Sequence, residues 1–374
     1  MKPDEKRFSL MELAATLDGV ISLGRGDPDL DTPPHIIEQT MKRMAEPPDS
    51  LEVRGLEELR LAVAKRYRDE KNLDFDPETE ILVTNGAQEG LFLSVLALLN
   101  PGDEILVPDP RYGSYDQAIA TAGGEMVPLP TGDDHHFGLR PQTVAETNAG
   151  KVLLLVNPSN PTGALTPGDD VREIAKIAVD KDLIVISDEV YEKLTFGEEV
   201  LSVAACEEMR ERTVTLSSLS KTYAMTGFRI GYLIGPPPFI EAAERLKANV
   251  SGPTALLSQF AGIAALEGPQ DVVETYRQIY AGRLRVMREG FDRLGIPYGK
   301  PGGGFFLWAD VSRFGIGAER FCRELLTNHR VLMFPGTAFG ERWSNYVRIS
   351  LLQPEERIEE AVGRIEAYVR SIGA

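Results

Sequence analysis

The sequence has little cysteine, no long apolar run and no excess of positive charge. Only Cys206 and Cys322 occur in 374 residues, which is too few for a disulfide framework or a zinc-ligand spacing. The formal net charge of -17 argues against nucleic-acid binding, which requires a basic face. The most apolar helical pattern, residues 255–266, is too short to cross a bilayer and carries polar residues. The sequence therefore predicts that the protein binds neither nucleic acid nor membrane.

Signals for export and for metal binding are also missing. Residues 1–10 are polar and charged, without the apolar segment of a secretory signal peptide. His135 and His136 have no further ligand residue at a useful spacing, so we expect no metal site. Together with the scarcity of cysteine, these absences predict a reduced, cytoplasmic setting.

What the sequence does contain is a regular alternation of short apolar runs with helical patterns. The helical patterns are clearest at residues 87–99 and 169–181. Runs rich in Val, Ile and Leu suit strands that are buried on both faces. We expect such strands at residues 80–84, 104–108, 125–128, 151–157, 183–187, 213–217 and 230–234. The alternation predicts an α/β fold in which a mostly parallel, seven-stranded sheet lies between helices.

The pattern changes beyond Pro253. Long helical patterns at residues 270–294 and 355–372 flank two β-like stretches, at residues 304–310 and 346–351. This arrangement predicts a smaller α+β domain, and a chain of this length is expected to divide in this way. We place the large domain at residues 35–275 and the small domain at residues 276–374. Residues 1–34 are expected to be irregular and to pack against the small domain or a partner subunit.

The segment most suggestive of chemistry is Ser-Ser-Leu-Ser-Lys-Thr-Tyr-Ala-Met-Thr-Gly-Phe-Arg, residues 217–229. Lys221 follows a predicted strand among small hydroxyl residues, and Arg229 comes eight positions later. Such a lysine can form a Schiff base, while the hydroxyls and the guanidinium can bind a phosphate. A single lysine is ordinarily a solvated surface charge, but the length of this pattern argues against that explanation.

Two further motifs extend this pattern to both ends of the chain. They are Gly-Arg-Gly-Asp-Pro-Asp at residues 24–29 and Val-Arg-Ile-Ser at residues 347–350. In their order and spacing, these motifs make the sequence resemble the class I and II aminotransferases of the fold-type-I pyridoxal-phosphate family over nearly its whole length. The resemblance implies pyridoxal 5'-phosphate as cofactor and transfer of an amino group from an L-amino acid to a 2-oxo acid by a ping-pong mechanism. It also implies a homodimer, because the family builds its sites at a subunit boundary.

The resemblance gives roles to the residues around the cofactor ring. Lys221 corresponds to the lysine that binds the cofactor covalently and moves the proton at the substrate Cα. Asp188 corresponds to the acid that pairs with the pyridine nitrogen, and Tyr191 and Asn160 to the groups that hydrogen-bond the ring oxygen. Tyr112 corresponds to the aromatic residue that stacks on the ring. Tyr115, close to Tyr112 in the sequence, is expected to be structural.

Other matched residues are assigned to the phosphate and to the substrate. Backbone N–H groups at a helix start form an anion site, and the family uses this point for the cofactor phosphate. The matching residues are Gly86, Ala87 and Gln88, with Ser218, Ser220 and Arg229 completing the site. Arg348 corresponds to the arginine that binds the substrate α-carboxylate, as a planar guanidinium can do with two hydrogen bonds. Gly26 and Asn160 are expected to border the substrate.

The sequence departs from the family pattern at two positions. Ser50 stands where relatives usually have a tyrosine that reaches the cofactor phosphate of the neighbouring subunit. Gln88 stands where some aspartate-type relatives have a lysine that contacts a side-chain carboxylate. Arg25 and Arg54 are candidate substitutes for that lysine, although both are equally well explained as surface charges. The sequence therefore does not identify the amino donor.

Two alternative functions remain open at this point. Carbon–sulfur β-lyases and related synthases share nearly all of these residues, because one scaffold can host several reactions. Release of pyruvate and ammonia without a 2-oxo acid acceptor would favour a lyase. The fold also serves as the ligand-sensing domain of transcriptional regulators. No helix-turn-helix pattern fits before Gly24, and the chain is acidic, so the enzymatic function is favoured.

Overall fold

A large central sheet organises the computed structural model, which describes residues 3–48 and 50–373. Its strands are β2 (Ile81–Thr84), β3 (Glu104–Asp109), β4 (Glu125–Pro130), β5 (Val152–Val156), β6 (Ile184–Asp188), β7 (Thr213–Ser218) and β8 (Gly231–Ile234). Their order in the sheet is β2-β8-β7-β6-β5-β3-β4. Strand β8 is antiparallel to both of its neighbours, and the other pairs are parallel. The predicted seven-stranded, mostly parallel sheet is confirmed.

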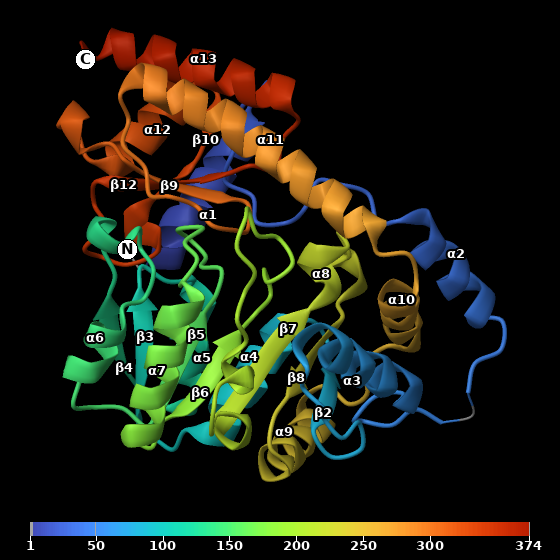
Figure 1. Ribbon diagram of the computed structural model, residues 1–374. Coiled ribbons are helices and arrows are strands. Elements are labelled where there is room, and N and C mark those ends of the chain that lie inside the picture. Colours follow the sequence, from blue (N-terminus) through green and yellow to red (C-terminus); the bar gives the residue numbers. More distant parts are fainter. Residues whose placement is uncertain (1–2, 49, 374) are drawn as a thin grey trace.

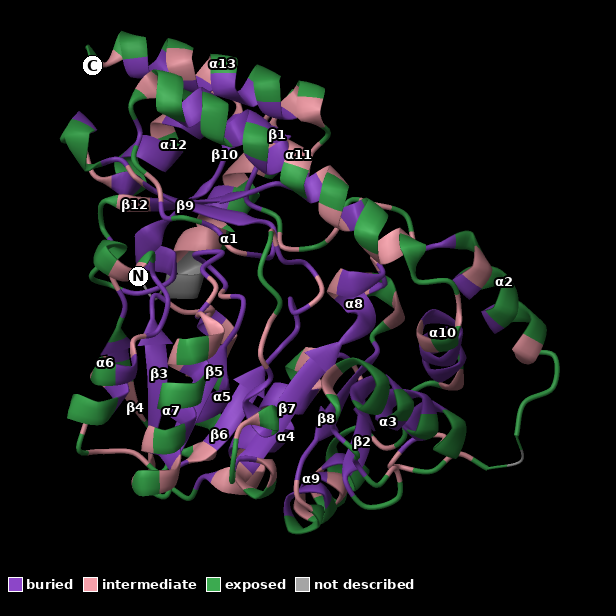
Figure 2. Cartoon of the chain, in the orientation of Figure 1, coloured by how far each residue is buried: buried purple, intermediate pink, exposed green. Residues whose placement is uncertain are grey.

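Helices cover both faces of this sheet (Figure 1). Successive strand residues point to opposite faces, so Leu154 packs with one helix layer and Leu153 with the other. One layer contains α4 (Ala87–Leu98), α5 (Gly113–Ala122) and α9 (Pro237–Val250). The other contains α3 (Glu57–Lys71), α6 (Pro141–Glu146), α7 (Gly168–Asp180) and α10 (Leu256–Glu267). Figure 2 shows the strands between them buried, as their apolar sequences require.

A second, smaller sheet lies above the first in the view of Figure 1. It is antiparallel, in the order β11-β12-β9, and is formed by β9 (Phe306–Asp310), β11 (Phe334–Pro335) and β12 (Tyr346–Ser350). The long helices α11 (Asp271–Leu294), α12 (Ala318–His329) and α13 (Glu355–Ser371) share its hydrophobic core. These elements confirm the helices and β-like stretches predicted beyond Pro253.

The N-terminal segment differs from the prediction. We expected residues 1–34 to be irregular, but α1 (Pro3–Ala15) is a helix. Proline and glycine are concentrated in residues 19–34, whereas residues 4–15 contain neither and are rich in good helix formers. Helix α1 packs against the segment that runs from β10 (Val331–Leu332) to Ala338. Strand β1 (Ile21–Ser22) pairs with β10 in parallel.

The remaining elements connect these layers. Helix α2 (Pro34–Arg43) packs on α10, and the short helix α8 (Leu219–Thr222) follows β7 directly. Short 3-10 helices lie at Asp133–His135, Val203–Ala205, Arg210–Arg212, Thr226–Phe228, Ser312–Phe314 and Gly336–Ala338. Within the described part of the chain, no helix combines the length and the apolar character needed to cross a membrane.

Candidate active site

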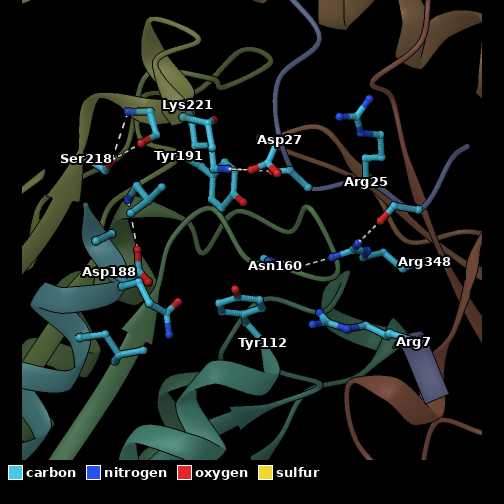
Figure 3. A pocket seen from close by; sticks show the side chains of 18 of the residues that line it. Arg7, Arg25, Asp27, Tyr112, Asn160, Asp188, Tyr191, Ser218, Lys221 and Arg348 are labelled. Atoms are coloured by element: carbon cyan, nitrogen blue, oxygen red, sulfur yellow. Dashed lines mark hydrogen bonds and ion pairs between the residues drawn. The ribbon is translucent and has the colours of Figure 1, made fainter. Parts of the chain in front are cut away.

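The ends of the large-sheet strands meet at one edge, where a cavity of about 640 Å³ opens. Strands β2, β3, β5, β6 and β7 finish at this edge, and antiparallel β8 begins there. Ligands of open α/β sheets bind outside the carboxyl ends of the strands. The cavity brings together the predicted residues Gly26, Ala87, Gln88, Tyr112, Asn160, Asp188, Tyr191, Ser218, Ser220, Lys221, Arg229 and Arg348. Figure 3 shows how several of them converge.

Lys221 enters the cavity from α8. Ser218 caps this helix by accepting a hydrogen bond from the Ser220 N–H, which fixes the turn that follows β7. The Lys221 amine donates to the Gly26 carbonyl at 2.7 Å and pairs with Asp27 at 3.2 Å (Figure 3). Burial lowers the pKa of Lys221, and Arg229 and Arg348 lower it further, while Asp27 opposes them. The amine therefore gives up its proton more readily than an exposed lysine.

Asp188 stands at the end of β6, buried in the cavity wall. Its carboxylate accepts hydrogen bonds from the Tyr115 hydroxyl at 2.8 Å and the Val190 N–H at 3.2 Å. No Lys, Arg or His within residues 3–48 and 50–373 forms an ion pair with it. Burial therefore raises the pKa of Asp188 to about 6. A carboxylate in this position is suited to a cationic N–H group of a ligand.

Neighbouring side chains of the loop after β6 point in different directions. Asp188 and Tyr191 line the cavity, whereas the intervening Glu189 points the other way, toward α3. Lys71 pairs with Glu189 at 2.6 Å and also with Glu192. Ser187 and Ser202 donate to the same Glu189 carboxylate at 3.0 and 2.7 Å. Sequence reasoning missed this cluster, which anchors the backbone on either side of Asp188.

Arg66 completes the buried cluster. Its guanidinium pairs with Glu192 at 2.6 Å and donates to the Tyr232 hydroxyl at 3.1 Å. Both Arg66 and Lys71 lie on α3, and their positive charges hold the pKa of Glu192 down to about 2, against the effect of burial. Ion pairs between α3 and Glu189 and Glu192 thus hold the loop that carries Asp188 and Tyr191 against this helix.

The part of the cavity predicted to bind a phosphate is formed by the turn between β2 and α4. Gly86 precedes α4 with φ 77°, a conformation that glycine adopts without strain. A Cβ atom at this position would lie 2.6 Å from a terminal nitrogen of Arg229, so a larger residue would displace that guanidinium from its place beside the turn. Arg229 donates to the carbonyls of Thr226 and Asn85 at 3.1 and 3.4 Å. A helix N-terminus beside a guanidinium is a suitable anion site.

Arg348 lies on β12, fully buried among aromatic rings. Its guanidinium carbon is 4.4 Å from the ring centre of Phe306 and 4.7 Å from that of Phe339. It donates to the Gly24 carbonyl at 2.7 Å and to Asn160 at 3.1 Å, while its Nε has no hydrogen-bond partner among the residues that the structure describes. Burial, followed by the charge of Arg7, lowers the pKa of Arg348 to about 9. This incompletely satisfied guanidinium is ready to bind an anion.

Two tyrosines shape the floor of the cavity. Tyr112 immediately precedes α5, and its ring contacts that of Tyr115 edge-on at 5.7 Å. We expected Tyr115 to be structural, but its hydroxyl is a hydrogen-bond donor to Asp188. The available signal was the three-residue spacing of the two tyrosines, which places Tyr115 in the first turn of the helix that Tyr112 precedes.

The departures from the family pattern have different outcomes. Arg54 does not line the cavity, because it pairs with Glu244 and donates to a backbone carbonyl. Arg25 does line it, but its side chain points away from Arg348 (Figure 3). Ser50 is exposed and is not among the lining residues. Arg7 of α1, which the sequence did not suggest, lines the cavity beside Tyr112.

The chemistry of the lining residues fits pyridoxal phosphate. Asp188 is a buried acid without a cation, as pairing with a protonated pyridine nitrogen requires. Arg229 and the α4 N-terminus, with the space left by Gly86, suit a phosphate. Lys221 offers an amine whose pKa is lowered. Of possible metal sites, the described residues contain no group of three or more His, Cys, Asp or Glu side chains that could hold an ion.

Known proteins resemble this chain over nearly its full length. A sequence profile of the family described as aminotransferase class I and II matches residues 18–365. The aspartate aminotransferase of Pyrococcus abyssi is 36% identical, over 99% of this chain and 96% of its own. The aromatic-amino-acid aminotransferase 2 of Thermococcus litoralis is 34% identical over the same shares. A solved single mutant of aspartate aminotransferase from Thermus thermophilus, 33% identical, superposes with a TM-score of 0.93, covering 99% of this chain and 97% of that one.

Proposed function

The chain belongs to the class I and II aminotransferases, and from this premise we propose that it uses pyridoxal 5'-phosphate to move the amino group of an L-amino acid to a 2-oxo acid. Amino-group transfer is the activity in the names of its relatives. One observation carries the assignment of the site. The cavity holds a lysine of lowered pKa, a buried acid without a cation and an incompletely satisfied arginine.

The proposed cofactor would be held by residues from several strand ends. Asp188 would pair with the ring nitrogen, Tyr191 and Asn160 would bond the ring oxygen, and Tyr112 would stack on the ring. Ser218, Ser220, Arg229 and the backbone at Gly86, Ala87 and Gln88 would bind the phosphate. When bound, pyridoxal phosphate supplies an electrophilic carbon for the amino group and a ring that accepts the electron pair left when Cα loses a proton.

Lys221 performs the proton transfer in this proposal. A general base works best when its pKa is near the operating pH, and burial brings the pKa of Lys221 toward that range. Its Nζ accepts the proton from the substrate Cα and later returns a proton on the cofactor side. Gly26 and Asp27 receive the resulting ammonium group, since both already bind Nζ.

Arg348 orients the substrate by binding its α-carboxylate. The rings of Phe306, Phe334 and Phe339 surround the guanidinium and exclude water, which strengthens a charge-assisted hydrogen bond. Asn160, already bonded to Arg348, fixes the guanidinium plane. Donor and acceptor share this one carboxylate site, so they bind alternately and the kinetics are ping-pong.

We further propose a cytoplasmic homodimer whose subunits divide into residues 1–34, 35–275 and 276–374. Large apolar side chains are exposed on α1, α2, α3, α9 and α10, and a subunit interface that covers some of them would remove apolar surface from water. These side chains are Phe8, Met11, Ile37, Met41, Leu61, Val250 and Leu257. Light scattering coupled to gel filtration should give twice the chain mass of 41.1 kDa; a monomer would overturn the homodimer.

A donor and acceptor panel tests the reaction. Protein loaded with pyridoxal phosphate is incubated with single amino acids, with and without pyruvate or 2-oxoglutarate, and all products are quantified. We expect equal amounts of a new amino acid and a new 2-oxo acid, formed only when an acceptor is present, with parallel double-reciprocal plots. Pyruvate and ammonia released from cysteine-type substrates without an acceptor would instead establish a lyase.

A further inference from the structure

A buried ion pair lies at the start of α4, beside the turn that follows β2. The side chain of Lys247, on α9, is 0% exposed, and its amine pairs with Glu89 in the first turn of α4 at 2.8 Å. Helix α9 packs on α4, and residues of both helices share one hydrophobic core. A lysine side chain is almost never fully buried unless it is paired, so each charge of this pair depends on the other.

Glu89 also binds the turn itself. Its carboxylate accepts hydrogen bonds from the Asn85 N–H at 2.6 Å and from the Asn85 side-chain amide at 3.0 Å. The hydroxyl of Ser251, the residue that follows α9, donates to the same carboxylate. Burial raises the pKa of Glu89, but the hydrogen bonds from Lys247, Ser251 and Asn85 together hold it below its ordinary value. The carboxylate is therefore charged at neutral pH.

The turn that Glu89 holds is the part of the cavity predicted to bind a phosphate. The Asn85 carbonyl accepts a hydrogen bond from Arg229 at 3.4 Å. The first N–H groups of a helix have no partner within that helix, and Ala87 and Gln88, the first two residues of α4, line the cavity. By fixing the backbone at Asn85, Glu89 fixes the direction in which these N–H groups point.

The charge of Glu89 conflicts with the use of this turn as an anion site. Carboxylates and phosphates are both stabilised at the positive end of a helix. A charged carboxylate in the first turn of α4 would therefore repel a phosphate bound at the same end. Lys247 removes this conflict because its ammonium group neutralises the carboxylate. Neither Glu89 nor Lys247 is among the lining residues of the cavity, so the pair acts through the turn.

We propose that Glu89 and Lys247 are positioning residues for the cofactor phosphate: Glu89 holds the turn, and Lys247 neutralises Glu89 so that the turn accepts an anion. This inference rests on the proposed function, because it takes this turn as the phosphate site. An ion pair that only supported the fold would affect every ligand of the cavity alike. The proposed role instead affects the phosphate more than the rest of the cofactor.

The test separates the phosphate from the rest of the cofactor. Pyridoxal has the ring and the aldehyde of pyridoxal phosphate but no phosphate. We define the phosphate preference as the dissociation constant of pyridoxal divided by that of pyridoxal phosphate. Both are measured by equilibrium dialysis on the full chain freed of cofactor, with circular dichroism as the check that each variant is folded. Pyridoxamine and its phosphate, which have no aldehyde, give the corresponding ratio without a covalent bond to Lys221.

We expect Lys247→Met to lower the phosphate preference roughly 10-fold, the equivalent of about 1.4 kcal/mol, because it leaves Glu89 charged beside the phosphate. The double variant Glu89→Gln/Lys247→Met removes both charges and keeps an acceptor for the Asn85 N–H. It should restore the preference to within about threefold of wild type. An unchanged preference in Lys247→Met, or a double variant without any recovery, would overturn the proposal.

Glu89→Gln decides the question if Lys247→Met does not fold. This variant loses the carboxylate and keeps the ammonium group, so its phosphate preference should equal or exceed that of wild type. A lower preference would overturn the proposal. The pyridoxamine pair should show the same changes in every variant, and a change confined to the two aldehydes would place the effect at Lys221 instead of at the turn.

Two controls test whether any lost charge or any broken pair has the same effect. Arg245→Met removes an exposed positive charge from α9, the helix that carries Lys247. Lys71→Met breaks a buried ion pair on the other helix layer. Neither should change the phosphate preference, although Lys71→Met should weaken the binding of both ligands by similar factors. A 10-fold loss of preference in either control would contradict a specific role for Lys247.

Failure of the proposed function would give a different result. Wild type would then bind pyridoxal phosphate no more tightly than pyridoxal. A wild type that prefers pyridoxal phosphate, together with Lys247→Met that keeps this whole preference, would leave the proposed function intact and reject only the role of the ion pair.

Discussion

Two groups of buried charges lie on the two sides of the loop after β6. The charges of one group are paired within the chain, whereas those of the other are not. On the α3 side, Lys71 and Arg66 meet Glu189 and Glu192 in a buried cluster where each charge has a partner. On the cavity side, no cation of the described chain pairs with Asp188, and the Nε of Arg348 has no partner there either. Asp188 and Glu189 are adjacent in the sequence, yet Glu189 belongs to the complete group and Asp188 to the incomplete one.

This difference separates stability from function. A buried charge that is paired within the chain costs little as long as both partners remain, and removing one partner is strongly destabilising. A buried charge without a partner lowers the stability of the protein and is retained because a ligand will complete it. The pKa directions agree, because Glu192 is held below its ordinary value and Asp188 above it.

The largest expected effect comes from breaking the complete cluster. Lys71→Met should reduce the free energy of unfolding of the cofactor-free protein by about 3–5 kcal/mol, because it leaves Glu189 and Glu192 buried with too little positive charge. Lys65→Met, on the exposed face of the same helix, should cost less than about 1 kcal/mol. Urea unfolding of both variants measures the difference. Equal losses would mean that the buried cluster has no special role.

Removing a charge from the incomplete group should change the free energy of unfolding much less. Arg348→Met deletes a buried guanidinium whose partners are two neutral oxygens. The free energy of unfolding of the cofactor-free protein should fall by no more than about 1 kcal/mol, while binding of α-carboxylate substrates is lost. A loss of stability as large as that of Lys71→Met would contradict the comparison.

The pH dependence of stability should have opposite signs in the two groups. The pKa of Asp188 is raised to about 6 in the folded protein, so its stabilising contribution is complete near pH 4 and is lost as the pH rises through 6. At pH 8, cofactor-free Asp188→Asn should therefore be more stable than wild type by about 3 kcal/mol, at about 1.4 kcal/mol per pH unit. This gap should close on acidification to pH 4.

Glu192 supplies the matching experiment. Its folded pKa is lowered to about 2, so its contribution is present above its ordinary range and is lost as the pH falls toward 2. Glu192→Gln should be less stable than wild type at pH 8, and that gap should begin to close only below about pH 4.5. Urea unfolding from pH 8 to pH 3 follows both variants. On acidification, the stability of wild type should rise relative to Asp188→Asn and fall relative to Glu192→Gln, and changes of the same sign would refute the distinction.

An effect smaller than that of removing the Asp188 charge is expected from the hydrogen bond that tunes this carboxylate. Tyr115→Phe removes a donor 2.8 Å from the carboxylate, so the pKa of Asp188 should rise by about one unit, the equivalent of about 1.4 kcal/mol. The midpoint of the Asp188-dependent change in stability should move upward accordingly. Tyr112→Phe is the control, because Tyr112 contacts Tyr115 without bonding Asp188. An unchanged midpoint in Tyr115→Phe would exclude the bond from this role.

The large sheet could be predicted from the sequence because each of its strands has a signal within its own few residues. Strands buried on both faces must be continuous apolar runs, and such runs are readable one at a time. Lys221 was found from the hydroxyl-rich pattern of residues 217–229, and the family resemblance gave Asp188, at the end of a predicted strand, its role. Helix α1 was missed because the prolines and glycines of residues 19–34 dominated the composition of the whole segment.

The other omissions depend on contacts that the sequence does not record. The pairing of Lys71 with Glu189 joins residues 118 positions apart, and the bond from Tyr115 to Asp188 spans 73. Arg7 reaches the cavity only because α1 packs on the segment before β12. Taken alone, each of these residues is of a type that is common at ordinary surface or core positions. Tertiary packing, which brings distant elements together, decides their roles.

In the proposed function, the amine of Lys221 completes the open side of this site. The direct measurement is to load the protein with pyridoxal phosphate, reduce it with borohydride and locate the pyridoxyl group by peptide mass spectrometry, with Lys221→Ala treated in parallel. We predict one modified peptide, carrying the group on Lys221, and none in the variant. Modification of a different lysine, or a protein that takes up no cofactor, would contradict the account.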